Sequence, residues 1–283
     1  MSAPVPVFDH SATAYSPRLA YAMALASRLA YEAEADIERQ AAAWGFERVR
    51  HHCTRFTPPF PLEDTQAFTM AGDRMIVTAF RGTEPRKLRD WLSDVEGVPW
   101  PGPGGLGYVH FGFGEALHSI FADVQGALAE LRDKQQTVWL TGHSLGGALA
   151  MLAGCRLHFE EPYLTADGIY TFGQPRTCDR ALADAHDKAF AGRMYRFVND
   201  KDVVPHLPPE PLYWHAQALR HIDAVGAVRE SVGLLGGFGE RMEHLGHVAK
   251  DMWDGAGDAF RDHGVAKYVA ALERLLVQGG PGA

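Results

Sequence analysis

The segment Thr141-Gly142-His143-Ser144-Leu145-Gly146-Gly147 contains the pattern Gly-x-Ser-x-Gly and decides the fold. A short run rich in β-forming residues, 137–141, leads into it, and small residues with leucines at helical spacing follow it. A strand, a glycine turn and a helix in this order predict a sharp turn that presents the hydroxyl of Ser144 at the end of a sheet. The alternative is a glycine-rich turn with an incidental serine.

The sequence around this segment alternates between strand and helix signals. Apolar runs predict buried strands over 75–80, 168–172 and 194–198, and helical spacing of apolar residues predicts helices over 117–131 and 180–190. Alternation of this kind indicates an α/β protein with a mostly parallel central sheet and helices on both faces.

The sequence of the N-terminal part predicts one long helix, followed by two strands joined by a turn. Ser16 is placed as an N-cap before Pro17, and apolar residues recur every three or four positions up to Gly45. Phe68 and Met70 alternate with polar neighbours ahead of a turn at 71–73. We therefore expect a single amphipathic helix from Pro17 to about Gly45, and then an outer strand that turns into the buried run 75–80.

Composition limits the classes of function. The chain has 283 residues, of which 46% are hydrophobic, so we expect a single domain over 1–283. A formal net charge of -8 argues against nucleic acid as a ligand, because such proteins need basic patches that neutralise phosphates. The three cysteines are too few and too widely spaced for a disulfide framework or a zinc site. We expect free thiols and neither a metal nor a cofactor.

The chain shows no targeting or membrane signal. Residues 1–10 contain no cationic start leading into an apolar run, and no stretch approaches the roughly 18 consecutive apolar residues of a membrane span. These features predict a cytoplasmic protein. Secretion with a leader that has been removed is the alternative.

A serine nucleophile needs a base and an acid, which in this fold follow it in the order acid, then histidine. Asp202 lies just past the strand 194–198 and is preferred over Asp200, with an Asx-turn role as the alternative for Asp202. His263 begins a loop directly before a C-terminal helix, a position from which a histidine can face the site with its backbone held. The remaining downstream histidines are interpreted as bystanders: His206, His215, His221, His244 and His247.

Hydrolysis also needs hydrogen-bond donors for the oxyanion of the tetrahedral intermediate. The amide of Leu145, the residue after the nucleophile, is one candidate. Thr83 follows the strand 75–80 and offers an amide and a hydroxyl from the correct edge of the sheet. A helix N-cap is the competing role for Thr83.

At this point the sequence resembles the class 3 lipases, the family of the filamentous-fungal triacylglycerol lipases. Six ordered blocks carry the resemblance: Val77 to Thr83, Asp90 to Asp94, Val109 to Phe113, Thr141 to Gly147, Phe172 to Arg176, and Asp202 to Pro209. The resemblance implies an α/β-hydrolase fold, a triad of Ser144, Asp202 and His263, and an oxyanion hole of Thr83 and Leu145.

Two segments are candidates for covering the site. By the same resemblance, 84–95 corresponds to a lid helix, with Leu88, Trp91 and Leu92 as its candidate apolar contacts; a solvated surface helix is the alternative. Residues 226–262 form an insertion before the histidine and contain apolar residues at helical spacing. The insertion is either a cap over the acyl pocket or an extra helix packed on the core.

The resemblance implies a carboxylic ester hydrolase acting on triacylglycerols or shorter acyl esters through an acyl-enzyme. Phospholipase, aryl-ester esterase and acyltransferase activities on the same triad are alternatives, and a non-catalytic binding protein on a hydrolase fold is a further one. The expected partner is an ester or lipid substrate, with transient contact at a lipid interface and no stable protein partner.

Overall fold

We describe the protein from a computed structural model. The structure describes residues 3–56, 64–83, 99–199, 202–208, 210–216, 218–223, 226–230 and 263–278. The candidate lid 84–95 and most of the insertion, 231–262, lie outside these residues. The assignment of 1–283 to a single domain therefore stays a prediction.

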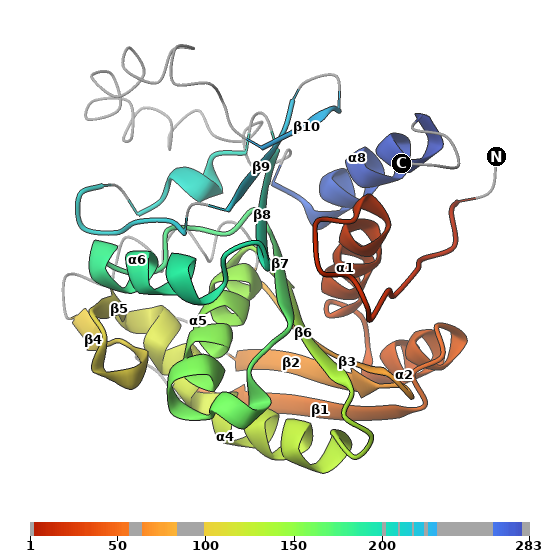
Figure 1. Ribbon diagram of the computed structural model, residues 1–283, viewed down its shortest axis with the longest axis horizontal. Helices are drawn as coiled ribbons and strands as arrows, with labels where there is room; N and C mark the ends of the chain where they lie inside the picture. Colours follow the sequence, from red (N-terminus) through yellow and green to blue (C-terminus); the bar gives the residue numbers. More distant parts are fainter. Residues whose placement is uncertain are drawn as a thin grey trace.

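An eight-stranded sheet forms the centre of the molecule (Figure 1), in the order β1-β2-β3-β6-β7-β8-β9-β10. The five strands β3, β6, β7, β8 and β9 are parallel, while β1 and β2 at one edge and β10 at the other run antiparallel to their neighbours. The bounds are β1 Arg48–Arg55, β2 Asp64–Ala71, β3 Met75–Phe80, β6 Thr137–His143, β7 Gly168–Phe172, β8 Met194–Asn199, β9 Leu219–Ile222 and β10 Val228–Arg229. This arrangement confirms the mostly parallel sheet predicted from the sequence.

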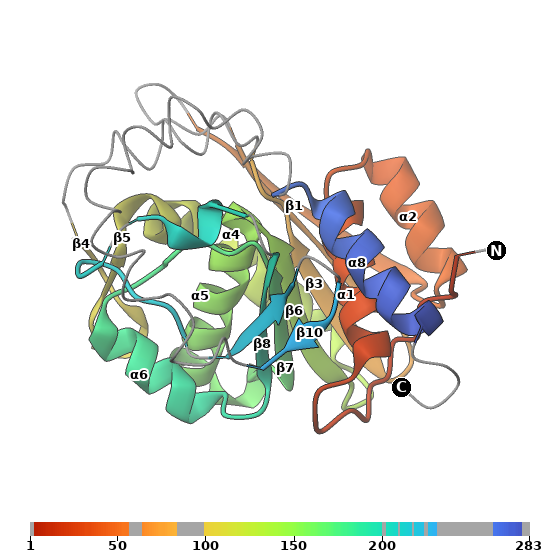
Figure 2. The same ribbon diagram turned by 90° about the horizontal axis from the view of Figure 1, so that it is seen from above.

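Helices cover both faces of the sheet (Figures 1 and 2). On one face lie α1 Pro17–Leu29, α2 Glu34–Ala43 and α8 Val265–Gln278; on the other lie α4 Phe111–Leu131, α5 Leu145–Glu160 and α6 Arg180–Ala189. A separate two-stranded sheet of β4 Pro99–Pro101 and β5 Tyr108–His110 precedes α4. Short 3-10 turns occur at Pro103–Gly105, Pro162–Leu164 and Val204–His206.

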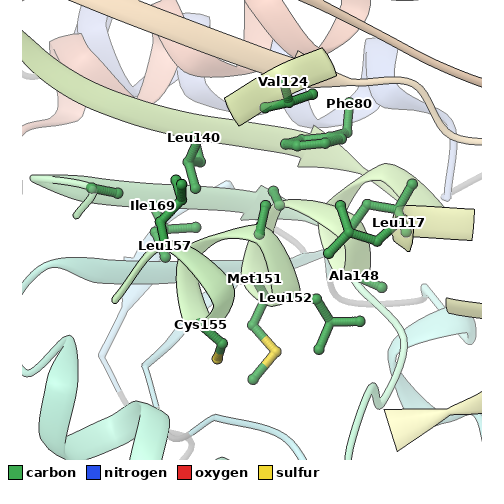
Figure 3. Close-up of a cluster of buried hydrophobic side chains, with 14 of the residues drawn as sticks. Phe80, Leu117, Val124, Leu140, Ala148, Met151, Leu152, Cys155, Leu157 and Ile169 are labelled. Carbon is green, nitrogen blue, oxygen red and sulfur yellow. The ribbon is translucent and has the colours of Figure 1, made fainter. Parts of the chain in front are cut away.

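Each face of the sheet has its own buried apolar cluster. The cluster under α4 and α5 includes Phe80, Leu140 and Ile169 from the strands, with Leu117 and Met151 from the helices (Figure 3). The cluster on the other face joins α1 and α8 to the same strands. Burial of apolar surface on both faces fixes the sheet, and with it the strand ends from which the loops of the site project.

The single long helix predicted for residues 17–45 is wrong, because α1 ends at Leu29 and α2 begins at Glu34. The start is as predicted: Pro17 occupies the first turn, and the hydroxyl of Ser16 accepts a hydrogen bond from the amide of Leu19 at 3.3 Å. The apolar spacing continues across the break, so periodicity alone cannot reveal it. Tyr31 lies in this break, and its side chain points into the candidate site.

Candidate active site

Ser144 occupies a strained turn between β6 and α5. Its backbone angles, φ 60° and ψ -128°, lie in a region that non-glycine residues rarely adopt. Its amide donates to the carbonyl of Phe172 at 2.9 Å, which ties the turn to the neighbouring strand β7. The serine is fully buried. The geometry is that of a nucleophile elbow, in which the side chain projects from the end of the strand.

The glycines of the motif are required by close backbone contacts. A Cβ on Gly142 would overlap the carbonyl group of Gly146, and a Cβ on Gly146 would overlap the carbonyl oxygen of Phe80. Larger residues at these positions would therefore push α5 away from β3 and β6. The motif Gly-x-Ser-x-Gly thus packs the helix against the sheet directly behind Ser144.

Asp202 and His263 form a buried pair. Nδ1 of His263 lies 2.9 Å from Oδ2 and 3.0 Å from Oδ1 of Asp202, and the two residues are 0% and 1% exposed, respectively. A carboxylate only accepts hydrogen bonds, so Nδ1 carries the proton. Nε2 of His263 is left as the unprotonated, basic nitrogen of the neutral ring.

The remaining reactive atoms are buried and unpaired. Within the described residues, neither Oγ of Ser144 nor Nε2 of His263 has a hydrogen-bond partner. A buried polar atom without a partner is costly, and functional sites are where such atoms persist. The structure therefore holds a hydroxyl and a basic nitrogen away from bulk solvent, an arrangement suited to general-base activation of a serine.

Gly173, at the end of β7, makes room for the Asp202–His263 pair. Its φ of +61° lies in the left-handed region, and a Cβ there would lie 2.8 Å from Oδ2 of Asp202 and 3.0 Å from Nδ1 of His263. Only glycine satisfies both the backbone angle and the space. The sequence resemblance included this residue in a family block but gave it no role.

The carboxylate of Asp202 has two further partners, of which only the Asx-turn contact with Val204 was considered from the sequence. Oδ1 accepts a hydrogen bond from the amide of Val204 at 3.0 Å, and Oδ2 accepts one from the hydroxyl of Tyr268 in α8. The hydroxyl oxygen of Tyr268 also accepts a hydrogen bond from the amide of Asn199 at 3.1 Å. These contacts fix the carboxylate plane that orients His263.

The candidate oxyanion donors lie beside Ser144. Leu145 is the first residue of α5, so its amide belongs to the free N-terminal turn of a helix. Gly82 passes so close to the elbow that a Cβ on it would lie 3.1 Å from Cβ of Ser144, and Thr83 follows directly. Leu145 is therefore adjacent to the nucleophile and Thr83 follows a residue that lies close to it, while their role as oxyanion donors stays a prediction.

Two residues near the site were missed by sequence reasoning, namely His143 and Tyr31. His143 is buried, its Nδ1 lies 2.8 Å from the hydroxyl of Tyr31, and its Nε2 lies 2.6 Å from the carbonyl oxygen of His263. Burial lowers the pKa of His143 to about 3, so the ring is neutral near pH 7. Its position next to Ser144 in the motif was the available signal.

The other downstream histidines have different surroundings. His206 is exposed, His221 lies on β9, and Nε2 of His215 donates to the carbonyl of Pro205 at 2.6 Å. His244 and His247, like Asp200, lie outside the described residues. The interpretation of these histidines as bystanders stays a prediction.

The described residues contain no group of histidine, cysteine and acidic side chains that could hold a metal ion. Among the same residues, no helix is both long and apolar enough to cross a membrane. The predicted lid contacts Leu88, Trp91 and Leu92 fall within residues that the structure does not describe.

A parallel sheet with a serine elbow at the end of a strand defines the α/β-hydrolase class. Within that class, the family model for lipase (class 3) matches residues 77–212. This match supports the class 3 lipase family, which the sequence blocks predicted. The match includes Ser144 and Asp202 and ends before His263.

Known sequences of this family share part of the chain. A lipase of Rhizomucor miehei is 38% identical over 156 residues, which cover 52% of this chain and 41% of that protein. A triacylglycerol lipase of Ricinus communis is 28% identical over 246 residues, which cover 67% of this chain and 46% of that protein. The chain thus spans less than half the length of these two relatives.

Solved structures agree on the fold. The structure of a Rhizomucor miehei lipase propeptide complex matches with a TM-score of 0.54 and 29% identity, covering 74% of this chain and 68% of that one. A Penicillium cyclopium protein matches with a TM-score of 0.56 at 21% identity, covering 77% of this chain and 85% of that one, and supports the fold alone.

The comparisons overturn the prediction of a cytoplasmic location. A lipase from Gibberella zeae, 29% identical over 51% of this chain, and one from Malassezia restricta, 38% identical over 33% of it, are both named as secreted mono- and diacylglycerol lipases. These names point to an extracellular location. The first residues of a sequence are weak evidence of where a protein resides, because leaders are absent from mature secreted proteins.

Proposed function

We propose that the protein hydrolyses carboxylic esters of lipids through an acyl-enzyme on Ser144. The observation that carries this proposal is the buried Asp202–His263 pair, with its basic Nε2 unpaired, in the same site as the strained serine elbow. Similarity to lipases from fungi and plants supports the ester substrate.

The proposed reaction follows from the proton positions. His263 accepts the proton of Ser144 at Nε2 while Oγ attacks the ester carbonyl, and Asp202 holds Nδ1–H and stabilises the imidazolium. The amide of Leu145 and the donors of Thr83 bind the oxyanion. The imidazolium then protonates the leaving alcohol, and the same nitrogen activates the water that releases the acid and restores the serine.

A phospholipase A1 activity is the second candidate on the same triad. A protein of Oryza sativa named phospholipase A1-II is 27% identical over 172 residues, which cover 49% of this chain and 42% of that one. The chemistry at Ser144 is the same for both substrates. The difference lies in the alcohol part of the ester, so the two candidates must be separated by assay.

The test uses purified protein with p-nitrophenyl esters of increasing chain length, then a triacylglycerol emulsion, then phosphatidylcholine vesicles. We expect the wild-type protein to hydrolyse these esters. In Ser144→Ala, kcat should fall on the order of a millionfold. Thr83→Ala, which removes a hydroxyl and leaves the amide, should lose roughly a hundredfold to a thousandfold if the hydroxyl binds the oxyanion. Near-native activity of Ser144→Ala would overturn the proposal.

A further inference from the structure

A chain of contacts next to Ser144 links the backbone of His263 to that of Gly82. The carbonyl oxygen of His263 can only accept, so Nε2 of His143, 2.6 Å away, carries the proton and donates. Nδ1 of the neutral ring is then the acceptor, and the hydroxyl of Tyr31 donates to it at 2.8 Å. The two contacts thus fix a single tautomer of His143.

The other end of the chain reaches the oxyanion segment. The oxygen of Tyr31 lies against Gly82, because a Cβ on Gly82 would overlap that oxygen. Gly82 directly precedes Thr83, the proposed oxyanion donor. The contacts therefore run from the Gly82 backbone through the Tyr31 hydroxyl and the His143 ring to the His263 carbonyl. Ser144 follows His143 in the chain, and its Cβ lies close to Gly82.

His143 also lies beside the proposed base. The ring centroids of His143 and His263 are 4.6 Å apart, with 36° between the planes. Catalysis places a positive charge on His263, and a second cation at this distance would oppose it. Burial keeps His143 uncharged, so it holds the backbone of His263 without weakening the base.

We propose that Tyr31 and His143 are positioning residues. They hold the segment of the base, at His263, and the oxyanion segment, at Gly82–Thr83, in fixed positions relative to Ser144. This inference rests on the proposed ester hydrolysis. Tyr31 lies in the break between α1 and α2, so the N-terminal helices take part in positioning the site. Neither residue exchanges a proton with substrate in this proposal.

The test compares Tyr31→Phe with Tyr195→Phe. Each variant removes one tyrosine hydroxyl that donates a hydrogen bond, but the hydroxyl of Tyr195 bonds to the carbonyl of Gly192 at 2.6 Å and is not part of the chain of contacts next to Ser144. We expect Tyr31→Phe to lower kcat for a p-nitrophenyl ester about tenfold at unchanged KM, because the variant loses one hydrogen bond that positions the site. Tyr195→Phe should keep the wild-type kcat. Its melting temperature should shift by about as much as that of Tyr31→Phe.

A second pair of variants separates alignment from folding. In His143→Gln, the side-chain amide can still donate to the carbonyl of His263, whereas His143→Leu removes both contacts. We expect the glutamine variant to retain at least tenfold more kcat than the leucine variant, with rates corrected for the folded fraction. If the leucine variant does not fold, the comparison of Tyr31→Phe with Tyr195→Phe decides alone.

The outcomes are distinct from those of the proposed function. Wild-type protein without esterase activity would defeat the proposed function itself. Active wild type with an unchanged kcat in Tyr31→Phe would overturn the positioning role. A rise in KM at constant kcat would also overturn it, because that result would place Tyr31 in contact with substrate.

Discussion

The hydroxyl of Tyr268 donates a hydrogen bond to Oδ2 of Asp202, and both residues are almost completely buried. Burial and the adjacent carboxylate raise the pKa of Tyr268, so it stays protonated and acts as the donor. Tyr268 lies in α8 and His263 lies two residues before that helix, so one C-terminal segment supplies two of the groups that bind the carboxylate.

Removal of this hydroxyl should weaken catalysis more than substrate binding. In Tyr268→Phe, Oδ2 of Asp202 loses a buried donor, and we expect kcat to fall about tenfold at nearly constant KM. Steady-state kinetics with a soluble p-nitrophenyl ester measure both constants. Tyr163→Phe, at a position that is 64% exposed, is the control and should behave as wild type. Equal kcat values in the two variants would argue against a role for Tyr268 in holding Asp202.

Gly173→Ala should abolish most of the activity through a steric effect on the Asp202–His263 pair. The new methyl group would lie 2.8 Å from Oδ2 of Asp202, so the pair would have to move. A displacement of up to about 1 Å should lower kcat on the order of a hundredfold. The positive φ adds a cost of about 1–2 kcal/mol in the free energy of unfolding.

Gly192→Ala is the matched control for that prediction. Gly192 has a φ of +70°, and nothing lies within 4 Å of a Cβ built there. The variant therefore carries the backbone strain without the steric contact, and should lose stability but keep its kcat. Urea unfolding and kinetics on both variants separate the two effects. A comparable loss of kcat in both would mean that strain, and not contact with the pair, is responsible.

Acidification should destabilise the fold through buried histidines. Burial lowers the pKa of His52 and His110 to about 4 and that of His143 to about 3. Between these values and about 6.5, the unfolded chain binds protons that the folded chain does not, so the free energy of unfolding falls as the pH falls. Each such histidine contributes a slope of up to about 1.4 kcal/mol per pH unit in this range.

His52 offers a clean test of this dependence, because it lies on β1 away from the serine elbow and its Nε2 contacts the hydroxyl of Thr69 at 2.9 Å. His52→Gln keeps a polar group there but cannot be protonated in this range. Urea unfolding at pH 7, 6 and 5 should give a shallower loss of stability for this variant than for wild type. Parallel pH dependences would show that His52 is protonated without penalty in the folded state.

The sequence was sufficient to predict the fold, the resemblance to the class 3 lipases and the candidates Ser144, Asp202 and His263. Strand, glycine turn and helix around Ser144 are local signals. The order of acid and histidine limited the candidates to residues after Ser144, and Asp202 and His263 were preferred among these for their positions in loops. The structure brings that pair into contact, which a local pattern cannot show by itself.

What could not be predicted depends on contacts between distant residues. Tyr31 and His143 are 112 positions apart, and nothing local indicates their hydrogen bond. The break between α1 and α2 was missed because the apolar spacing continues through it. The edge strand β1 was missed because its sequence, Arg48–Arg55, is rich in basic residues, which are suited to a sheet edge but give no strong β signal.

Covalent labelling of the serine tests the central claim most directly. Purified protein is treated with a fluorophosphonate, digested, and the modified peptide identified by mass spectrometry. The account predicts one adduct, on Ser144, formed in wild type and slowed by at least a thousandfold in His263→Ala, because the hydroxyl then lacks its base. Absence of the adduct in folded wild-type protein, or an equal labelling rate in His263→Ala, would contradict it.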